Sequence, residues 1–387
     1  MIYPELENAG LVGKKSLFEK ASITRAARRG IDPALLERSL HCMEYAAQLA
    51  STGLDFVFKG GTACQLLVGG AVHRLSIDID IATNATEREI RQAMISVTAR
   101  TGGRTYVPAD VPRKGLDGVP ILMFNISAPT YYPWQKPETM IKLDIVQKTP
   151  RYDTAKRRLA TFYYESDVEV RTPTVGAMLG DKMSTLGPDT IGIPPDRAVD
   201  NVKQFYDVGS LLWLDFAPAE VKKAYQACFR DQARWRNISI SAEDALLDLA
   251  EWCKVASAMQ FVPSGVDMRK RQRIQALSSG VEGFAGYIAK ENSLTKRRLR
   301  EIASRTALVS RLLREDMDEG ILFDFVRHPD TYRDAVLKGF GEIEKGMEEV
   351  PATERWHIHP KEFKNNPLSM AAWLGYWRPD RLAGLLG

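Results

Sequence analysis

The stretch RLSIDIDIA, residues 74–82, alternates strictly between polar and apolar side chains. This period of two predicts a β-strand that buries one face and leaves the other face polar. The buried face has three isoleucines, whereas the polar face has Ser76, Asp78 and Asp80. Two carboxylates about 6.5–7 Å apart along one strand repel each other unless a cation lies between them, and oxygen ligands of this kind suit Mg²⁺. The fold therefore has to include a sheet with two neighbouring carboxylates on one strand.

An Asp-x-Asp pair alone also fits a strand that faces water, because alternating aspartates are common there. The preceding segment FVFKGGTACQLLV, residues 56–68, favours a binding site instead. An apolar run ends at Gly60 and Gly61, and helical spacing starts at Thr62, which indicates a strand, a tight turn and a helix. The N–H groups at a helix start favour an anion such as phosphate. A simple turn with glycine at positive φ is the alternative, and P-loop spacing is absent.

A third carboxylate comes from MIKLDIVQ, residues 140–147, where Asp144 shares a strand face with Lys142. Three carboxylates would hold divalent cations, Mg²⁺ or Mn²⁺, that activate an attacking oxygen and stabilise a leaving oxygen. An ion pair between Asp144 and Lys142 is the structural alternative. The candidate metal ligands are Asp78, Asp80 and Asp144, and the candidate nucleotide-binding residues are Lys59, Gly60, Gly61, Thr62 and Ser76. These residues together predict a site for a nucleoside triphosphate (NTP).

Strand-like and helix-like segments are unevenly distributed along the chain. Three strands, including the one that contains Asp144, are expected between residues 104 and 148, and helical periodicity prevails after residue 173. From residue 216 onward almost only helical spacing remains, with breaks near Pro263, Gly280, Gly320 and Pro329. The patterns predict an α+β fold, with a mixed sheet and helices in residues 1–215 and a mainly α-helical domain in residues 216–387.

Composition fits a globular chain, since 44% of the 387 residues are hydrophobic and 26% are charged. No segment reaches about 18 consecutive apolar residues, and the N-terminal stretch lacks the apolar core of a secretory signal. We therefore expect a cytoplasmic protein without a membrane span. The four cysteines form no C-x-x-C pair, which predicts free thiols rather than a zinc site or disulfides.

The net charge of +4 is small for a chain of this length. Residues 265–315, however, have 12 Lys/Arg against 5 Asp/Glu. This local excess predicts either a face for the phosphates of an RNA or helix faces that are simply solvated.

Several motifs, in this order, resemble those of the AbiEii/AbiGii-type toxin family of nucleotidyltransferases, which includes the MenT-like toxins. They are KGGTACQLL, HRLSIDIDI, KLDIV and, further on, LGDKMSTL with RAVDNVKQFYDV. The resemblance covers roughly residues 30–215. It implies a DNA polymerase beta-like nucleotidyltransferase core, followed by a helical C-terminal domain.

The resemblance also implies roles for single residues. Lys182 matches the family's essential lysine. Asp207 matches the acidic residue at the end of the family's Lys/Arg-Asp-x-Tyr-Asp-like motif. A lysine can neutralise charge on the β- and γ-phosphates, and a nearby carboxylate can orient that lysine. This chain has Gln204 where the family commonly has an acidic residue. The candidate catalytic residues are Asp78, Asp80, Asp144, Lys182 and Asp207.

The function implied by the resemblance is that of a metal-dependent nucleotidyltransferase, the toxin of a toxin–antitoxin or phage-defence system. Such an enzyme moves a nucleoside monophosphate from an NTP to an RNA acceptor, often the 3′ end of tRNA, and releases pyrophosphate. Its partner would be an antitoxin encoded nearby. Two alternatives remain open: an inactive nucleotide- or RNA-binding protein of the same fold, and an enzyme that transfers a nucleotidyl or phosphoryl group to protein.

Overall fold

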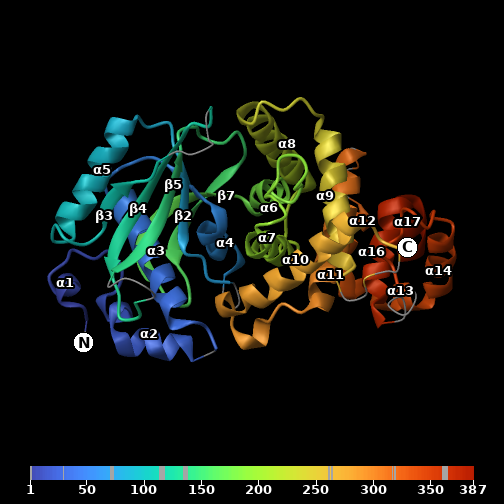
Figure 1. The fold of residues 1–387 in the computed structure, drawn as a ribbon, viewed down its shortest axis with the longest axis horizontal. Helices are drawn as coiled ribbons and strands as arrows, with labels where there is room; N and C mark the ends of the chain where they lie inside the picture. Colours follow the sequence, from blue (N-terminus) through green and yellow to red (C-terminus); the bar gives the residue numbers. More distant parts are fainter. Residues whose placement is uncertain are drawn as a thin grey trace. The chain divides into compact units, whose positions relative to one another are not determined.

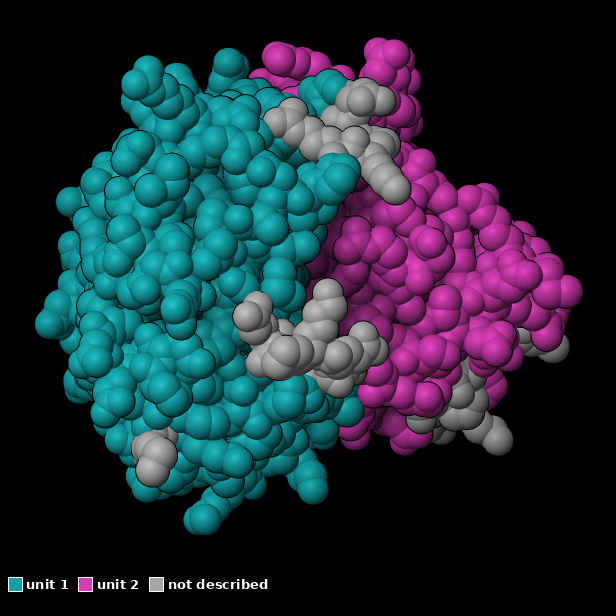
Figure 2. Space-filling view, turned by 60° about the vertical axis from the view of Figure 1, so that its left-hand side comes forward, with its two compact units in different colours: residues 1–174, 285–293 teal, residues 175–284, 294–387 magenta. Residues whose placement is uncertain are grey.

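The computed structural model describes residues 2–28, 30–69, 74–112, 118–133, 138–259, 262, 265–315, 317, 320–359 and 365–387. The chain divides into two compact units, coloured separately in Figure 2: residues 1–174 with 285–293, and residues 175–284 with 294–387. The end of the nucleotidyltransferase domain expected near residue 215 stays a prediction, because compactness alone does not define which helices serve a site.

The first unit is built on a mixed sheet (Figure 1). The described residues give it seven strands in the order β3-β4-β5-β2-β1-β7-β6. Strand β2 is antiparallel to β1 and parallel to β5, so β2 lies between two neighbours of opposite direction. The strands are Val57–Lys59 (β1), Asp78–Ala82 (β2), Val107–Asp110 (β3), Ile121–Pro129 (β4), Glu138–Val146 (β5), Thr154–Ala160 (β6) and Glu165–Pro173 (β7).

Helices cover the apolar face of this sheet. Helix α3 begins where the Asp32 carboxylate accepts hydrogen bonds from the N–H groups of Ala34 and Leu35. Arg38 Nε of α3 donates to Thr139 Oγ1 at 3.1 Å, on the side of β5 that carries its buried apolar residues. The helices and 3-10 turns of this unit are Pro4–Glu7 (α1), Lys15–Phe18 (η1), Lys20–Ala27 (α2), Pro33–Ala50 (α3), Gly60–Val68 (α4), Glu87–Arg100 (α5), Ala285–Tyr287 (η3) and Lys290–Asn292 (η4).

The predicted strand over residues 74–82 is shorter in the structure, where β2 starts at Asp78. Residues 74–77 pair differently: Leu75 N donates to Tyr287 O at 2.7 Å, and Ser39 Oγ donates to Ser76 O at 2.6 Å. The segment that leads into β2 is thus held by α3 and by the returning segment 285–293. No strand was expected from the sequence between residues 149 and 173, where the structure has β6 and β7. The positions of β6 are mostly charged or exposed.

The second unit is helical, which confirms the α+β prediction with a helical C-terminal part. Its elements are Val175–Met183 (α6), Ala198–Leu211 (α7), Pro218–Trp235 (α8), Ala242–Ser257 (α9), Met268–Phe284 (α10), Lys296–Arg314 (α11), Ile321–Arg327 (α12), Pro329–Tyr332 (η5), Arg333–Lys338 (α13), Phe340–Glu348 (α14), Pro367–Trp377 (α16) and Pro379–Leu386 (α17).

Two of the predicted helix breaks are confirmed, since α12 starts after Gly320 and a 3-10 turn starts at Pro329. The break expected near Gly280 is wrong, because α10 continues through it. A Cβ on Gly280 would lie 2.7 Å from the carbonyl oxygen of Ala198, so glycine here serves a close approach of α10 to α7. Pro263 lies outside the described residues.

Two further sequence expectations concern the whole chain. Each of the four cysteines, all within the described ranges, has a reduced thiol, as predicted. None of the helices in the described part of the chain is long and apolar enough to cross a membrane.

Candidate active site

Three adjacent strands bring the candidate carboxylates and Lys59 to one face of the sheet. The Cα atoms of Asp80 and Asp144 are partners across β2 and β5, and those of Lys59 and Asp80 are partners across β1 and β2. Residues that are partners across two strands share a face, and so do residues two apart on one strand. Lys59, Asp78, Asp80 and Asp144 therefore all lie on the face opposite the buried isoleucines.

Lys142 lies among these carboxylates. Its Nζ is 2.7 Å from Asp144 Oδ2, and its Cα is the partner of the Asp78 Cα. Burial lowers the pKa of Lys142, but its hydrogen bond to Asp144 and the charges of Asp144, Asp78 and Asp80 outweigh burial, so the pKa is raised. The ion pair that was the structural alternative for Asp144 is thus present.

The second carboxylate oxygen of Asp144 is different. Oδ1 is buried and accepts no hydrogen bond from the described residues, and the Asp144 side chain as a whole is 19% exposed. A buried carboxylate oxygen without a donor is costly unless a ligand satisfies it. Asp144 therefore has one oxygen that binds Lys142 and one that is available to a cation.

The Gly-Gly-Thr turn faces the same carboxylates. Gly60 has φ +71°, and a Cβ at this position would overlap Asp80 Oδ2. Thr62 is fully buried, and its hydroxyl donates to the backbone oxygen of Asp78. The turn between β1 and α4 thus packs directly against β2, as the strand, turn and helix prediction requires.

Arg74 is a candidate that the sequence did not single out. Its side chain is only 3% exposed, and a Cβ on Gly61 would overlap Arg74 Nη2 and lie 2.8 Å from Ser76 Oγ. A guanidinium and a hydroxyl therefore lie beside the start of α4, where anions are favoured. The sequence pattern already indicated this position, because Arg74 and Ser76 alternate in step with Asp78 and so belong to the polar face of the predicted strand.

The second unit brings Lys182 and Asp207 together. Lys182 Nζ on α6 lies 2.8 Å from Asp207 Oδ2 on α7, and the two side chains are 6% and 0% exposed. Lys182 Nζ also donates to Gln204 Oε1 at 3.0 Å. Gln204, the departure from the family pattern, thus contributes a neutral acceptor where an acidic residue would contribute a charge.

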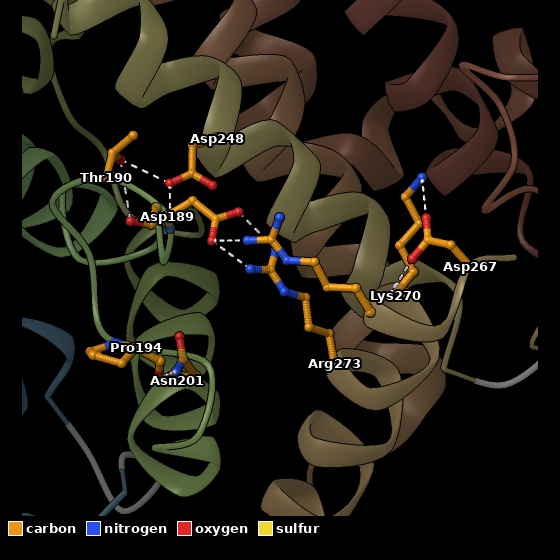
Figure 3. A network of polar contacts seen from close by, with 10 residues as sticks. Asp189, Thr190, Pro194, Asn201, Asp248, Asp267, Lys270 and Arg273 are labelled. Atoms are coloured by element: carbon orange, nitrogen blue, oxygen red, sulfur yellow. Dashed lines mark hydrogen bonds and ion pairs between the residues drawn. The ribbon is translucent and has the colours of Figure 1, made fainter.

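The long loop between α6 and α7 is held by a polar network (Figure 3). Arg269 Nη2 and Arg273 Nη1 of α10 donate to the Asp189 carboxylate at 2.8 and 2.9 Å, and the hydrogen bond from Arg273 lowers the pKa of that carboxyl. Asp248 Oδ2 accepts hydrogen bonds from Asp189 N and Thr190 Oγ1, both at 2.8 Å. The loop is therefore fixed to α9 and α10 although it has no helix or strand of its own.

This network also uses part of the basic segment 265–315. Arg269 and Arg273 pair with Asp189, and Arg314 pairs with Glu243. Arg305 is buried and donates to the carbonyl oxygens of Leu212 and Val326, at the ends of α7 and α12. The charge excess of the sequence is thus partly internal, and the cations left exposed include Arg271, Lys296 and Arg297.

The first-unit residues fit a divalent cation chemically. Asp78 and Asp80 lie beside Asp144 across β2 and β5, and Asp144 Oδ1 is the orphaned buried oxygen described above. Carboxylate oxygens are the donors that Mg²⁺ and Mn²⁺ prefer. Within the described ranges, however, no three His, Cys, Asp or Glu side chains are already arranged around one point. Lys142 Nζ occupies the other oxygen of Asp144, Oδ2.

The family model described as nucleotidyl transferase AbiEii toxin, type IV TA system, matches residues 44–317 of this chain. The match extends over most of the chain and includes every candidate site residue. The chain belongs to the AbiEii nucleotidyltransferase toxin family. The resemblance seen in the motifs is thereby confirmed, and the AbiEii toxins are components of type IV toxin–antitoxin systems.

Other comparisons add little to this membership. Curated proteins give no match. The crystal structure of JHP933 from Helicobacter pylori is 13% identical, and the alignment covers 76% of this chain and 93% of that chain with a TM-score of 0.38.

Proposed function

We propose that this AbiEii-family chain is a divalent-metal-dependent enzyme that transfers a nucleoside monophosphate from an NTP to an RNA acceptor. The acceptor in this proposal is the 3′ end of tRNA, and the reaction takes place in the cytoplasm. The observation that carries the proposal is the shared strand face of Asp78, Asp80 and Asp144, with a glycine turn packed against Asp80. An inactive binding protein would not need to keep three carboxylates together at a cost in repulsion.

The turn and the lysine are proposed to bind the triphosphate. The N–H groups at the start of α4, which begins at Gly60, would donate to phosphate oxygens, and Thr62 holds this turn against β2 through its bond to Asp78 O. Lys182 would neutralise the charge that builds on the β- and γ-phosphates as they leave. Asp207 and Gln204 orient that ammonium, since both accept from Lys182 Nζ.

The carboxylates are proposed to serve the metal and the acceptor. Asp78, Asp80 and Asp144 would hold Mg²⁺ or Mn²⁺, which, when bound, stabilises charge on the attacking and leaving oxygens. Asp144 would also accept the proton of the acceptor hydroxyl. The hydroxyl oxygen then forms a bond to the α-phosphorus, the bond to the β-phosphate oxygen breaks, and pyrophosphate leaves.

Two further partners are proposed. An RNA acceptor would meet the exposed cations of the segment 265–315, such as Arg271, Lys296 and Arg297, which suit backbone phosphates. The toxin would be controlled by a cognate antitoxin, as membership of a type IV toxin–antitoxin family suggests.

Pyrophosphate release tests the proposal. Purified protein with Mg²⁺, total tRNA and each NTP in turn should release pyrophosphate with at least one NTP, and omission of tRNA or Mg²⁺ should stop it. Asp80→Asn should reduce the rate by about 100-fold or more, since it removes a charge at the reacting centre. Release that continues undiminished in Asp80→Asn would contradict the assignment of the site.

A further inference from the structure

Lys142 contacts one of the carboxylates of the candidate metal site. Its Nζ binds one oxygen of Asp144 at 2.7 Å, and its Cα is the partner of the Asp78 Cα. The ammonium therefore partly neutralises a face with three carboxylates.

The contact between Lys142 and Asp144 is suited to exchange. Only Oδ2 of Asp144 is used, and the Lys142 side chain is 43% exposed. A lysine ammonium sits on a flexible stem and makes point contacts, so it can change partners without a change in the backbone. Lys142 is the half-exposed member of the pair, so solvent screens part of its attraction to Asp144.

We propose that Lys142 is a positioning residue that gates the metal site. In the nucleotide-free chain its ammonium occupies Oδ2 of Asp144, so that only Oδ1 is available to the cation. When an NTP binds, the ammonium leaves Asp144 for the triphosphate, and both oxygens of Asp144 become available to the metal. This inference rests on the proposed nucleotidyl transfer, and it makes completion of the metal site depend on the arrival of the nucleotide.

The gate predicts two opposite effects of one substitution. Removal of the ammonium should free Asp144, so a nucleotide-free Lys142→Met chain should bind Mn²⁺ more tightly than the wild type. The same substitution removes a cation from the triphosphate, so binding of the NTP without metal should weaken. A lysine with a merely structural role would change neither affinity, or would weaken both.

The test measures the two affinities separately. Electron paramagnetic resonance of free Mn²⁺ gives metal binding without nucleotide, and calorimetry with an α,β-methylene NTP analogue in EDTA gives nucleotide binding without metal. For Lys142→Met we expect Mn²⁺ affinity to rise about tenfold and analogue affinity to fall about tenfold, within the usual range of coupling between sites. Lys142→Arg, which keeps the charge, should retain the wild-type analogue affinity.

Controls separate this inference from the proposed function. Lys14→Met removes a lysine from an exposed ion pair with Glu165 in the same unit and should leave both affinities unchanged. Asp80→Asn should abolish wild-type Mn²⁺ binding. If the wild type binds Mn²⁺ through Asp80 but Lys142→Met matches it in both affinities, or loses both, the gate is wrong and the proposed function stands. If the wild type binds no Mn²⁺ even with the analogue present, both are wrong.

A folding defect would not leave the question undecided. Circular dichroism reports whether Lys142→Met is folded, and Lys142→Gln provides a second variant that keeps a hydrogen bond to Asp144 without the charge. Lys142→Gln should shift both affinities in the same directions as Lys142→Met. A folded Lys142→Gln with wild-type affinities would overturn the proposal.

Discussion

The Asp80 carboxylate fills the space in front of Gly60. A Cβ on Gly60 would overlap Asp80 Oδ2, and the backbone of Gly60 has φ +71°. The turn between β1 and α4 and the strand β2 therefore meet at Gly60, and glycine is required there for two separate reasons, its positive φ and the nearby carboxylate.

Gly60→Ala should damage both stability and activity. The positive φ costs an alanine about 1 kcal/mol, and displacement of Asp80 costs roughly another 1–3 kcal/mol. Urea unfolding measures the total, and nucleotide incorporation should fall at least as far as in Asp80→Asn. Gly53→Ala is the matched control, because Gly53 also has positive φ (+84°) but has no neighbouring atom within 4 Å of a Cβ. Equal losses of stability and activity in the two variants would show that the contact with Asp80 does not cause the defect of Gly60→Ala.

The buried pair of Lys182 and Asp207 should respond differently to single and double substitution. Loss of one partner leaves a buried charge and should lower the free energy of unfolding by about 3–5 kcal/mol. The double variant Lys182→Met/Asp207→Leu replaces both charges with apolar side chains and should recover most of that stability. It should remain inactive in nucleotide incorporation. Recovery of activity along with stability would show that the pair is structural only.

The loop between α6 and α7 should depend on Asp189. Asp189→Asn weakens the contacts with Arg269 and Arg273, so the free energy of unfolding should fall by about 1 kcal/mol or less, and limited proteolysis within residues 187–196 should become faster. Asp267→Asn is the control, since Asp267, directly before α10, pairs with Lys270 and lies apart from Asp189 (Figure 3). Unchanged cleavage in Asp189→Asn would mean that the Asp248 contacts suffice to fix the loop.

Stability should fall as the solution becomes acidic, partly because of His41. This histidine is fully buried, its Nδ1 lies 2.8 Å from the Tyr106 hydroxyl, and burial lowers its pKa from 6.5 to about 3. Between these values the unfolded chain binds a proton that the folded chain does not bind. The stabilising contribution is therefore complete above the unfolded pKa of 6.5 and declines as the pH falls toward 3.

The size of this effect is measurable by urea unfolding at about pH 7.5 and about pH 5.5. His41 should account for a loss of roughly 1.4 kcal/mol between these conditions, and His41→Gln should show a pH dependence smaller by that amount. His328→Gln, at an exposed position, should keep the wild-type dependence. A His41→Gln variant with the full wild-type slope would contradict the assignment.

The period-two alternation of the strands was the basis for most of what the sequence could predict about the candidate site. Period-two alternation is a local property, so the shared face of Asp78 and Asp80 followed directly, and Asp144 followed from a second alternating stretch. The partner of Asp144 did not follow, because alternation gives the face of a side chain and not its neighbour. Both the ligand role and the ion pair with Lys142 had been open, and the structure shows the ion pair.

Other features needed three-dimensional contacts. Arg74 has the phase of the carboxylates, but its burial beside Gly61 depends on a turn that lies earlier in the chain. The charge excess of the segment 265–315 is visible in the sequence, yet Arg273 and Arg305 bind partners within the second unit, which a count of charges does not identify. Gly280 suggested a helix break because glycine is common in turns. The sequence does not show that α10 passes close to α7 at this position, which also favours glycine.

The destination of the α-phosphate tests the central claim most directly. Wild-type protein with Mg²⁺, total tRNA and each α-³²P-labelled NTP should label the 3′ end of tRNA with at least one NTP, and γ-³²P label should not be transferred. Asp80→Asn should leave the RNA unlabelled. Label that enters protein, label that comes from the γ-phosphate, or equal labelling by wild type and Asp80→Asn would contradict nucleotidyl transfer to RNA at this site.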